Sequence, residues 1–195
     1  MVITLDQPQE TLINKIQSIQ ADLTRAVTDY WHHYSSFNSW QFWVVTAFLI
    51  LPLIAIFLFI DRKRALLLGF YGYNVHVWFT YIDIIGGTMN RWFYPYKVFP
   101  FFSTSFSLDV SLIPMTYMFV YQWTLNHRKN YYLFMLLLCL FLAFVFKPIL
   151  SSIDLFELSH GTNYFHLFLG YLFIGLFSKI ITNVFIYLQK KGDQQ

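Results

Sequence analysis

Charge is what this sequence lacks most. Charged residues make up 12% of the 195 residues, whereas 57% are hydrophobic and 22% are aromatic. A soluble domain usually carries roughly 25% charged residues, and a chain this short cannot hide so much apolar surface from water. We therefore expect an integral membrane protein with one membrane domain, for which the lipid bilayer is the main partner.

Cysteine and catalytic motifs are also scarce. The single cysteine, Cys139, lies in an apolar run, so it cannot form an intrachain disulfide or a cysteine-rich metal site and is expected to pack as a small hydrophobic side chain. No HExxH, GxSxG or phosphate-cradling glycine loop is present. We therefore expect no catalytic residues, no metal and no cofactor. The net charge of +3 is too dispersed to indicate a nucleic-acid partner.

Long apolar runs are what the sequence has instead. Each is close to the ~20 residues that a helix needs to cross a bilayer, and none alternates with the period of two of a membrane strand. We therefore predict an all-α membrane bundle of five transmembrane helices within residues 39–189, followed by a cytoplasmic tail at 190–195. The predicted spans are residues 42–60, 65–85, 103–123, 131–150 and 164–188.

The basic residues set the predicted orientation. They are concentrated in two short turns, 61–64 and 124–130, and in the C-terminal tail, whereas the loops on the other side contain only Arg91 and Lys97. Because cytoplasmic loops carry the excess of Lys and Arg, we expect the N-terminus outside and the C-terminus inside the plasma membrane. The residues on the cytoplasmic side are Arg62, Lys63, Arg64, Arg128, Lys129, Lys190 and Lys191.

Residues 1–38 are predicted to form an extracytoplasmic tail and amphipathic helix. Apolar residues recur at spacings of three and four within 9–34, beginning with Leu12, Ile16, Ile19 and Leu23. One interpretation is a helix that packs on the membrane domain or lies at the interface. The other is a short oligomerising helix, because the stripe fits a heptad for about three repeats. That helix would bind a second copy or a membrane partner.

Two acidic residues, Asp83 and Asp109, stand in apolar sequence, where a charge is costly and usually functional. Asp83 follows Tyr73, His76 and Thr80 at helical steps of three and four. These residues share one helix face, so we predict an intramembrane polar stripe that looks into the bundle.

The predicted topology brings several charges to the outer third of the bundle. Asp83, Asp109 and Lys147 lie near the outer ends of their spans. The other four residues lie on the two outer loops. We predict a polar cluster or ligand pocket at this place. It consists of Asp83, Asp109, Lys147, Arg91, Lys97, Glu157 and His160.

Two interpretations of this cluster stay open. The charges could form salt bridges that fasten the helices and the outer loop. Alternatively, they could line an outward-facing pocket for a cation, a small molecule or a lipid head group. Pro114 favours the pocket, because it leaves the carbonyl of Val110 without its helical donor close to Asp109.

Several segments together resemble a known family. Asp83 with Gly86-Gly87, Trp92, residues 94–100 and residues 108–122 are similar to a family of small multi-span membrane proteins of spore-forming Gram-positive bacteria. The similarity also covers the segments 29–43, 61–64 and 147–160. It implies a compact plasma-membrane protein without an established activity. Lys147 departs from the family, which usually has an acidic residue there, and this departure favours the salt-bridge interpretation.

A looser resemblance concerns membrane lycopene cyclase domains. Those proteins use two adjacent glutamates as an acid, whereas only Asp109 stands at the equivalent position here. Our leading hypothesis is a non-enzymatic membrane sensor, accessory or assembly component. The first alternative is an oligomeric transporter or channel for small solutes or ions that uses Asp83 and Asp109. The second is a membrane lipid or isoprenoid enzyme with Asp109 as its acid.

Overall fold

The computed structural model describes residues 7–159 and 161–192. It is all-α and about 80% helical, which confirms the predicted fold class. Within the described residues, three helices are long and apolar enough to cross a membrane, which supports the predicted membrane location. They are Trp40–Phe59, Tyr131–Ser152 and Tyr164–Gly192.

The first half of the chain forms three helices. Ser39 caps α2, since its hydroxyl accepts a hydrogen bond of 3.3 Å from the Phe42 amide. Helix α3 continues through Gly86 and Gly87 beyond the predicted span 65–85, because glycine inside a helix costs only about 1 kcal/mol. The elements are α1 (Gln7–Tyr30), the π-helical turn η1 (Trp31–Ser35), α2 (Trp40–Phe59), the 3-10 turn η2 (Arg62–Arg64) and α3 (Ala65–Thr88).

Two helices in the second half contain a π-helical turn. The predicted span 103–123 is displaced, because residues 103–105 are not helical and α4 continues to Asn126. Helix α7 also continues into the predicted tail at 190–195, as far as Gly192. The elements are η3 (Leu108–Leu112), α4 (Ile113–Asn126), α5 (Tyr131–Phe141), η4 (Leu142–Phe146), α6 (Lys147–Ser152) and α7 (Tyr164–Gly192).

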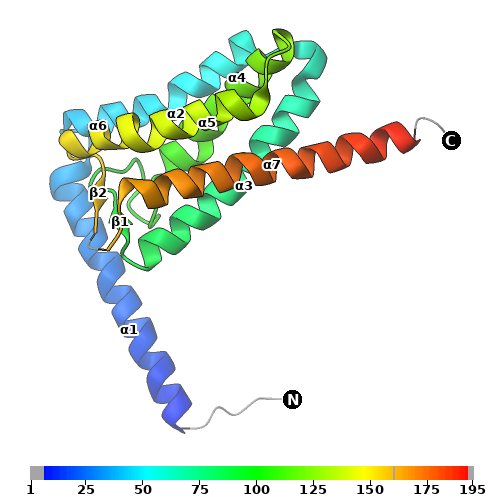
Figure 1. The fold of residues 1–195 in the computed structure, drawn as a ribbon. Coiled ribbons are helices and arrows are strands. Elements are labelled where there is room, and N and C mark those ends of the chain that lie inside the picture. The colour runs from blue at the N-terminus through cyan, green and yellow to red at the C-terminus, as the bar shows by residue number, and fades with distance from the viewer. Residues whose placement is uncertain (1–6, 160, 193–195) are drawn as a thin grey trace.

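A short strand pair that the sequence pattern did not predict joins two loops. Strand β1 (Trp92–Phe93) pairs antiparallel with β2 (Glu157–Leu158), with Trp92 opposite Leu158. The pair lies at the end of the bundle where α2 begins, whereas α7 runs toward the opposite end (Figure 1). It therefore ties both long loops to one end of the bundle.

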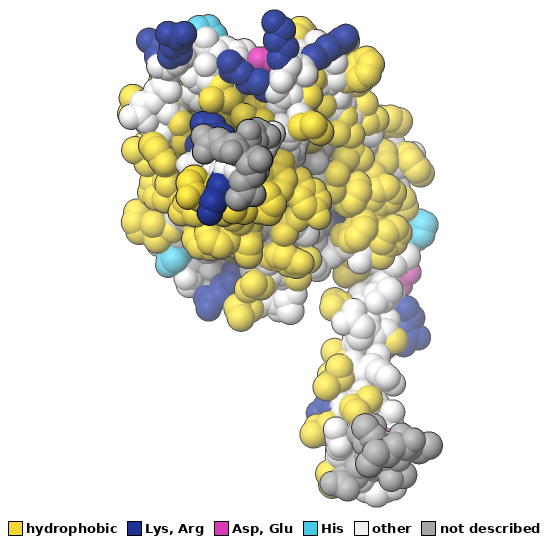
Figure 2. Space-filling model, turned by 90° about the vertical axis from the view of Figure 1, so that its right-hand side faces the viewer, with side chains coloured by type: hydrophobic (Ala, Val, Ile, Leu, Met, Phe, Trp, Pro, Cys, Tyr) yellow, Lys and Arg dark blue, Asp and Glu magenta, His cyan; other side chains and the backbone are white. Residues whose placement is uncertain are grey.

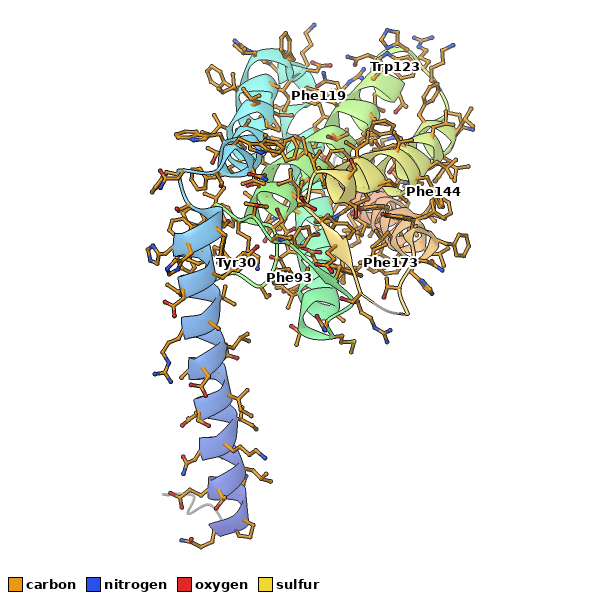
Figure 3. All side chains as sticks on the ribbon, turned by 90° about the vertical axis from the view of Figure 1, so that its left-hand side faces the viewer. Tyr30, Phe93, Phe119, Trp123, Phe144 and Phe173 are labelled. Carbon is orange, nitrogen blue, oxygen red and sulfur yellow. The ribbon has the colours of Figure 1, made fainter. Side chains whose placement is uncertain are left out.

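The helices α2 to α7 pack into one bundle. Helix α3 lies against both α7 and α4, and α4 lies against α5. Helix α1 stands apart, because it leaves the bundle beside the strand pair and runs across the direction of α2 and α7 (Figures 1 and 3). Hydrophobic side chains cover most of the bundle surface in Figure 2, while Lys and Arg gather along its upper edge.

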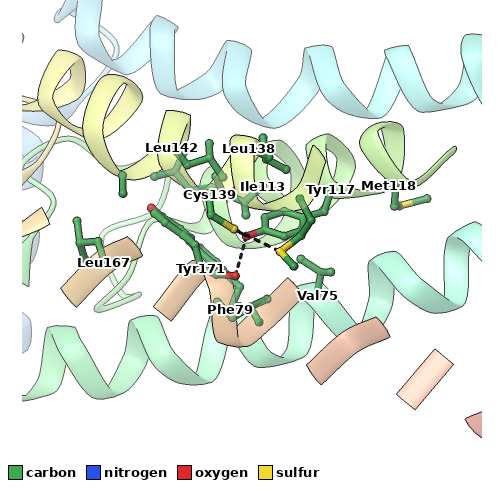
Figure 4. Packing of buried hydrophobic residues seen from close by; sticks show 14 of the residues in the cluster. Val75, Phe79, Ile113, Tyr117, Met118, Leu138, Cys139, Leu142, Leu167 and Tyr171 are labelled. Atoms are coloured by element: carbon green, nitrogen blue, oxygen red, sulfur yellow. Dashed lines mark hydrogen bonds between the residues drawn. The ribbon is translucent and has the colours of Figure 1, made fainter. Parts of the chain in front are cut away.

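Tyrosine hydroxyls are satisfied inside the core. The Tyr117 hydroxyl donates to the Tyr171 carbonyl at 2.9 Å and lies 3.3 Å from the Cys139 sulfur (Figure 4). Cys139 is fully buried, as expected for a packing residue. The Tyr131 hydroxyl donates to the Gly175 carbonyl at 3.0 Å. Both tyrosine hydroxyls therefore find partners within the protein.

Candidate functional site

The two predicted carboxylates come together in the structure. Asp83 lies near the end of α3 and Asp109 in η3, and their exposed fractions are only 3% and 2%. The two carboxyl groups are within hydrogen-bonding range of each other, and the Thr104 hydroxyl lies beside Asp109. Two buried carboxyl groups this close cannot both be ionised without strong repulsion.

The loop after α3 closes over Asp83. The indole Nε1 of Trp92 donates to Asp83 Oδ1 at 2.7 Å, and the Tyr94 hydroxyl donates to the same oxygen at 2.9 Å. Gly86 makes this contact possible, because a Cβ atom there would lie 1.9 Å from the Trp92 ring. The carboxylate therefore holds the aromatic loop against the helix end.

Lys147 reaches Asp83 through Tyr94. Its ammonium donates to the Tyr94 hydroxyl at 3.0 Å and lies 3.7 Å from the centre of the Phe156 ring, a cation–π distance. Among the described residues, the ion pairs within 4.0 Å include neither aspartate. Lys147 and Asp83 therefore do not form the direct salt bridge of the first interpretation, and the Tyr94 hydroxyl carries the contact instead.

Two π-helical turns position Asp109 and Lys147. The Ile113 amide donates to the Leu108 carbonyl, and the Lys147 amide donates to the Leu142 carbonyl. In both places the bond spans five residues and the next residue is a proline, Pro114 or Pro148. Such turns occur frequently at functional sites.

The π-helical turn η3 changes which backbone carbonyl Pro114 leaves without a hydrogen-bond donor. In a regular α-helix, Pro114 would leave the carbonyl of Val110 without a donor, as the sequence predicted. Because the bonds in η3 span five residues, the carbonyl without a donor is that of Asp109. His76 Nδ1 lies 2.7 Å from this oxygen. Because a carbonyl only accepts, the proton must be on Nδ1. The kink therefore aims a backbone oxygen at a histidine rather than at a cation.

Lys97 links the cluster to the N-terminal helix. Its ammonium donates to the carbonyls of Phe102 and Ser103 at 2.9 and 3.2 Å, and burial lowers its pKa to about 8 although both aspartates oppose this change. Its amide donates to the Ser35 hydroxyl at 3.0 Å, and its carbonyl accepts from Trp31 Nε1 at 2.8 Å.

The other predicted cluster residues lie elsewhere. Arg91 and Glu157 are exposed, because charges on a surface loop keep their hydration by facing outward. His160 lies outside the described residues. These two exposed loop charges therefore do not join the cluster that the topology predicted.

The predicted polar stripe is only partly inward. Tyr73 is 65% exposed, since it lies roughly 80° around the helix from Asp83 at ~100° per residue. His76 and Thr80 are half-buried, with Thr80 Oγ1 3.3 Å from His76 Nδ1. The inward face of the stripe therefore begins at His76.

Four residues of the cluster were not predicted as site residues: Trp92, Tyr94, Thr104 and Phe156. Trp92 and Tyr94 stand out in the sequence through the family resemblance. Indole and phenol donors that follow an aspartate in apolar sequence are a further signal for such a site. A cavity of about 40 Å³ adjoins Asp83, Trp92, Tyr94 and Lys147, which is room for a water molecule.

Comparison with known proteins adds no relative. No family model, curated protein or solved structure matches the chain. Within the described residues, no group of three His, Cys, Asp or Glu side chains could hold a metal ion. The function must therefore be argued from the geometry of the cluster.

Proposed function

We propose that the protein is a non-enzymatic sensor of the plasma membrane with five spans, the N-terminus outside and the C-terminus inside. Helix α3 has 24 residues, about 36 Å at 1.5 Å per residue, enough for a hydrocarbon core of ~30 Å. The carboxyl groups of Asp83 in α3 and Asp109 in η3 are both buried within the protein. The polar content of these two helices therefore does not prevent them from crossing the bilayer.

One observation carries the proposal. Asp83 Oδ2 and Asp109 Oδ1 are buried, and neither has a hydrogen-bond partner among the described residues. Buried oxygens in native proteins nearly always have a partner, so two unpaired carboxyl oxygens in one cluster need an explanation. A proton between the two carboxyl groups supplies what both oxygens lack. We therefore assign the pair as the binding site of one shared proton.

Charge and ligand count favour a proton over a metal ion. Lys97 and Lys147 already offset two carboxylates, so a divalent cation would leave the buried site with a large positive charge. A Ca²⁺ ion also needs six to eight oxygen ligands, whereas a proton needs only the two unpaired oxygens. Binding of one proton between the two carboxyl groups leaves the contacts of the neighbouring residues unchanged. These residues are Trp92, Tyr94, Thr104 and Lys147.

The contacts around the pair provide a route for a signal. Trp92 and Tyr94 attach the loop to Asp83, and the Lys97 backbone attaches the same loop to Ser35 and Trp31 at the end of α1. A change in the charge of the pair therefore acts on the loop that holds α1. This arrangement suits a sensor of external acidity.

Infrared spectroscopy of the protein in proteoliposomes tests the proposal. We expect the carbonyl band of a protonated carboxyl group in the wild type and its loss at high external pH. Asp109→Asn and Asp83→Asn should each remove the band, because the remaining carboxylate then faces two lysines alone. Glu157→Gln, which changes an exposed carboxylate, is the matched control.

Two results would change the assignment. Absence of a protonated carboxyl band in the wild type at every pH would contradict the shared proton. Proton flux across proteoliposomes that requires both aspartates would indicate a transporter instead of a sensor.

A further inference from the structure

Helix α1 has an apolar side that the protein does not cover. No residue of this helix is buried, and Leu12, Ile16, Ile19 and Leu23 are 61, 65, 56 and 54% exposed. These four residues lie on one side of the helix, and Asn14 lies on the opposite side. A continuous apolar stripe on an exposed helix requires a partner.

The direction of α1 indicates where that partner lies. Figures 1 and 3 show α1 running across the direction of α2 and α7 from the end of the bundle that holds the strand pair. If α2 and α7 cross the bilayer, α1 runs along the membrane surface rather than out into water.

The apolar side of α1 faces the bundle rather than away from it. Leu23 and Val27 line a cavity of about 260 Å³ between α1 and the loop of Phe93, Phe101 and Phe102. Hydrophobic side chains are visible along α1 in Figure 2, which views the molecule from the side to which α7 extends. The apolar stripe of α1 therefore faces the side on which the membrane would lie.

Aromatic residues mark the same level at the junction of α1 and α2. Tyr34, Phe37, Trp40 and Trp43 are 63, 63, 55 and 58% exposed. Exposed Trp and Tyr residues are typical of the membrane–water interface. The lipid-facing surface of α2 thus continues into the apolar side of α1.

We propose that α1 lies on the outer leaflet with its apolar stripe inserted among the lipids. This inference rests on the proposed placement of the bundle in the membrane. The residues of α1 have a net charge of −1. Three of them are acidic (Glu10, Asp22 and Asp29) and two are basic (Lys15 and Arg25). Binding therefore comes from apolar burial and needs no anionic lipid.

A second copy of the chain is the less favoured occupant. The stripe faces the membrane side, so a partner helix would have to enter between α1 and the bilayer. Three heptad repeats are also the shortest stretch that indicates a coiled coil.

Spin labels on the full chain in zwitterionic vesicles test the inference. In a Cys139→Ala background, Ile16→Cys places a nitroxide on the stripe and Asn14→Cys places one on the opposite side. Phe57→Cys, at a position 76% exposed on α2, reports on the bundle. Collisions with oxygen indicate lipid, and collisions with a water-soluble nickel complex indicate water.

We expect the oxygen-to-nickel ratio to be several-fold higher at Ile16 than at Asn14, and unchanged by high salt or by added anionic lipid. Equal ratios at these two positions would overturn the inference. Shielding of the Ile16 label from both reagents, with spin–spin broadening between copies, would overturn it in favour of an oligomerising helix. The Phe57 label distinguishes failure of this inference from failure of the proposed function. Access of the nickel complex to Phe57 would refute the placement of the bundle in the membrane.

Discussion

The imidazole of His76 on α3 supplies the hydrogen bond that Pro114 cannot give to its own helix. Its Nδ1 atom lies 2.7 Å from the Asp109 carbonyl oxygen, the oxygen left without a donor by the π-helical turn. The same contact holds Asp109 beside Asp83. A backbone defect in one helix and a polar side chain in another therefore position the carboxyl pair together.

Loss of the His76 imidazole should be rescued by restoring the missing amide. His76→Leu is expected to lower the free energy of unfolding by about 1–2 kcal/mol, because a buried carbonyl loses its donor. Pro114→Ala supplies a backbone N–H to Asp109, so the double variant should recover much of the loss. Denaturant unfolding in detergent measures the free energies of the wild type, the two single variants and the double variant. Additive effects of the two substitutions would contradict the hydrogen bond from His76 to the Asp109 carbonyl.

Tyr94→Phe should destabilise the protein by about 2–4 kcal/mol, since it removes an acceptor of Lys147 and a donor to Asp83 at once. The aromatic ring and its packing remain. Tyr96→Phe is the matched control, because the hydroxyl of this half-buried loop tyrosine makes no hydrogen bond within the described part of the chain. Thermal unfolding of both variants should differ clearly; equal melting temperatures would argue against the bridge.

Substitution by alanine should destabilise the protein at only one of the two adjacent glycines at the end of α3. A Cβ atom at Gly86 would lie 1.9 Å from the Trp92 ring, whereas one at Gly87 would lie 3.4 Å from the Ser103 carbonyl oxygen. Gly86→Ala should therefore displace Trp92 from Asp83 and cost about 1–3 kcal/mol. Gly87→Ala should be nearly neutral, as helix propensity favours alanine. Tryptophan fluorescence and unfolding curves distinguish the two, and identical behaviour would show that Trp92 can move freely.

The sequence could predict that Asp83, Asp109 and Lys147 share a site. Each is a charge in apolar sequence, and the cost of burying a charge drives such groups together. The hydrogen bonds of Asp83 could not be predicted in the same way. They depend on Trp92 and Tyr94 in a loop, where residue spacing does not fix direction.

The π-helical turns could not be predicted either. One extra residue in a helical turn has no pattern of its own, so a proline in the sequence suggests a kink but not its register. The error concerning Val110 and Asp109 arose in this way. Strands of two residues are likewise too short to show an alternating pattern. The fold class, in contrast, follows from long apolar runs alone.

Thiol labelling in intact cells should confirm the proposed orientation. Met89, which is 64% exposed, lies near the strand pair, and exposed Lys129 lies in a basic turn. In a Cys139→Ala background, Met89→Cys should react with a membrane-impermeant maleimide added outside. Lys129→Cys should react only after permeabilisation, because basic turns stay in the cytoplasm. The reverse pattern would invert the topology, and labelling of both in intact cells would refute an odd number of spans between them.

Lys97 should make stability rise with pH in the alkaline range. Burial lowers its pKa from 10.5 to about 8, so between these values the unfolded chain binds the proton that the folded chain has released. The free energy of unfolding then increases with pH through this window, and below it the burial of the charged amine costs about 3 kcal/mol. Lys97→Met should reduce the rise, although it also loses the bonds to Phe102 and Ser103 at every pH. Lys63→Met changes an exposed lysine and should keep the wild-type slope. Denaturant unfolding across pH 8 to 10.5 measures all three proteins, and parallel curves for the two lysine variants would show that Lys97 is not the titrating group.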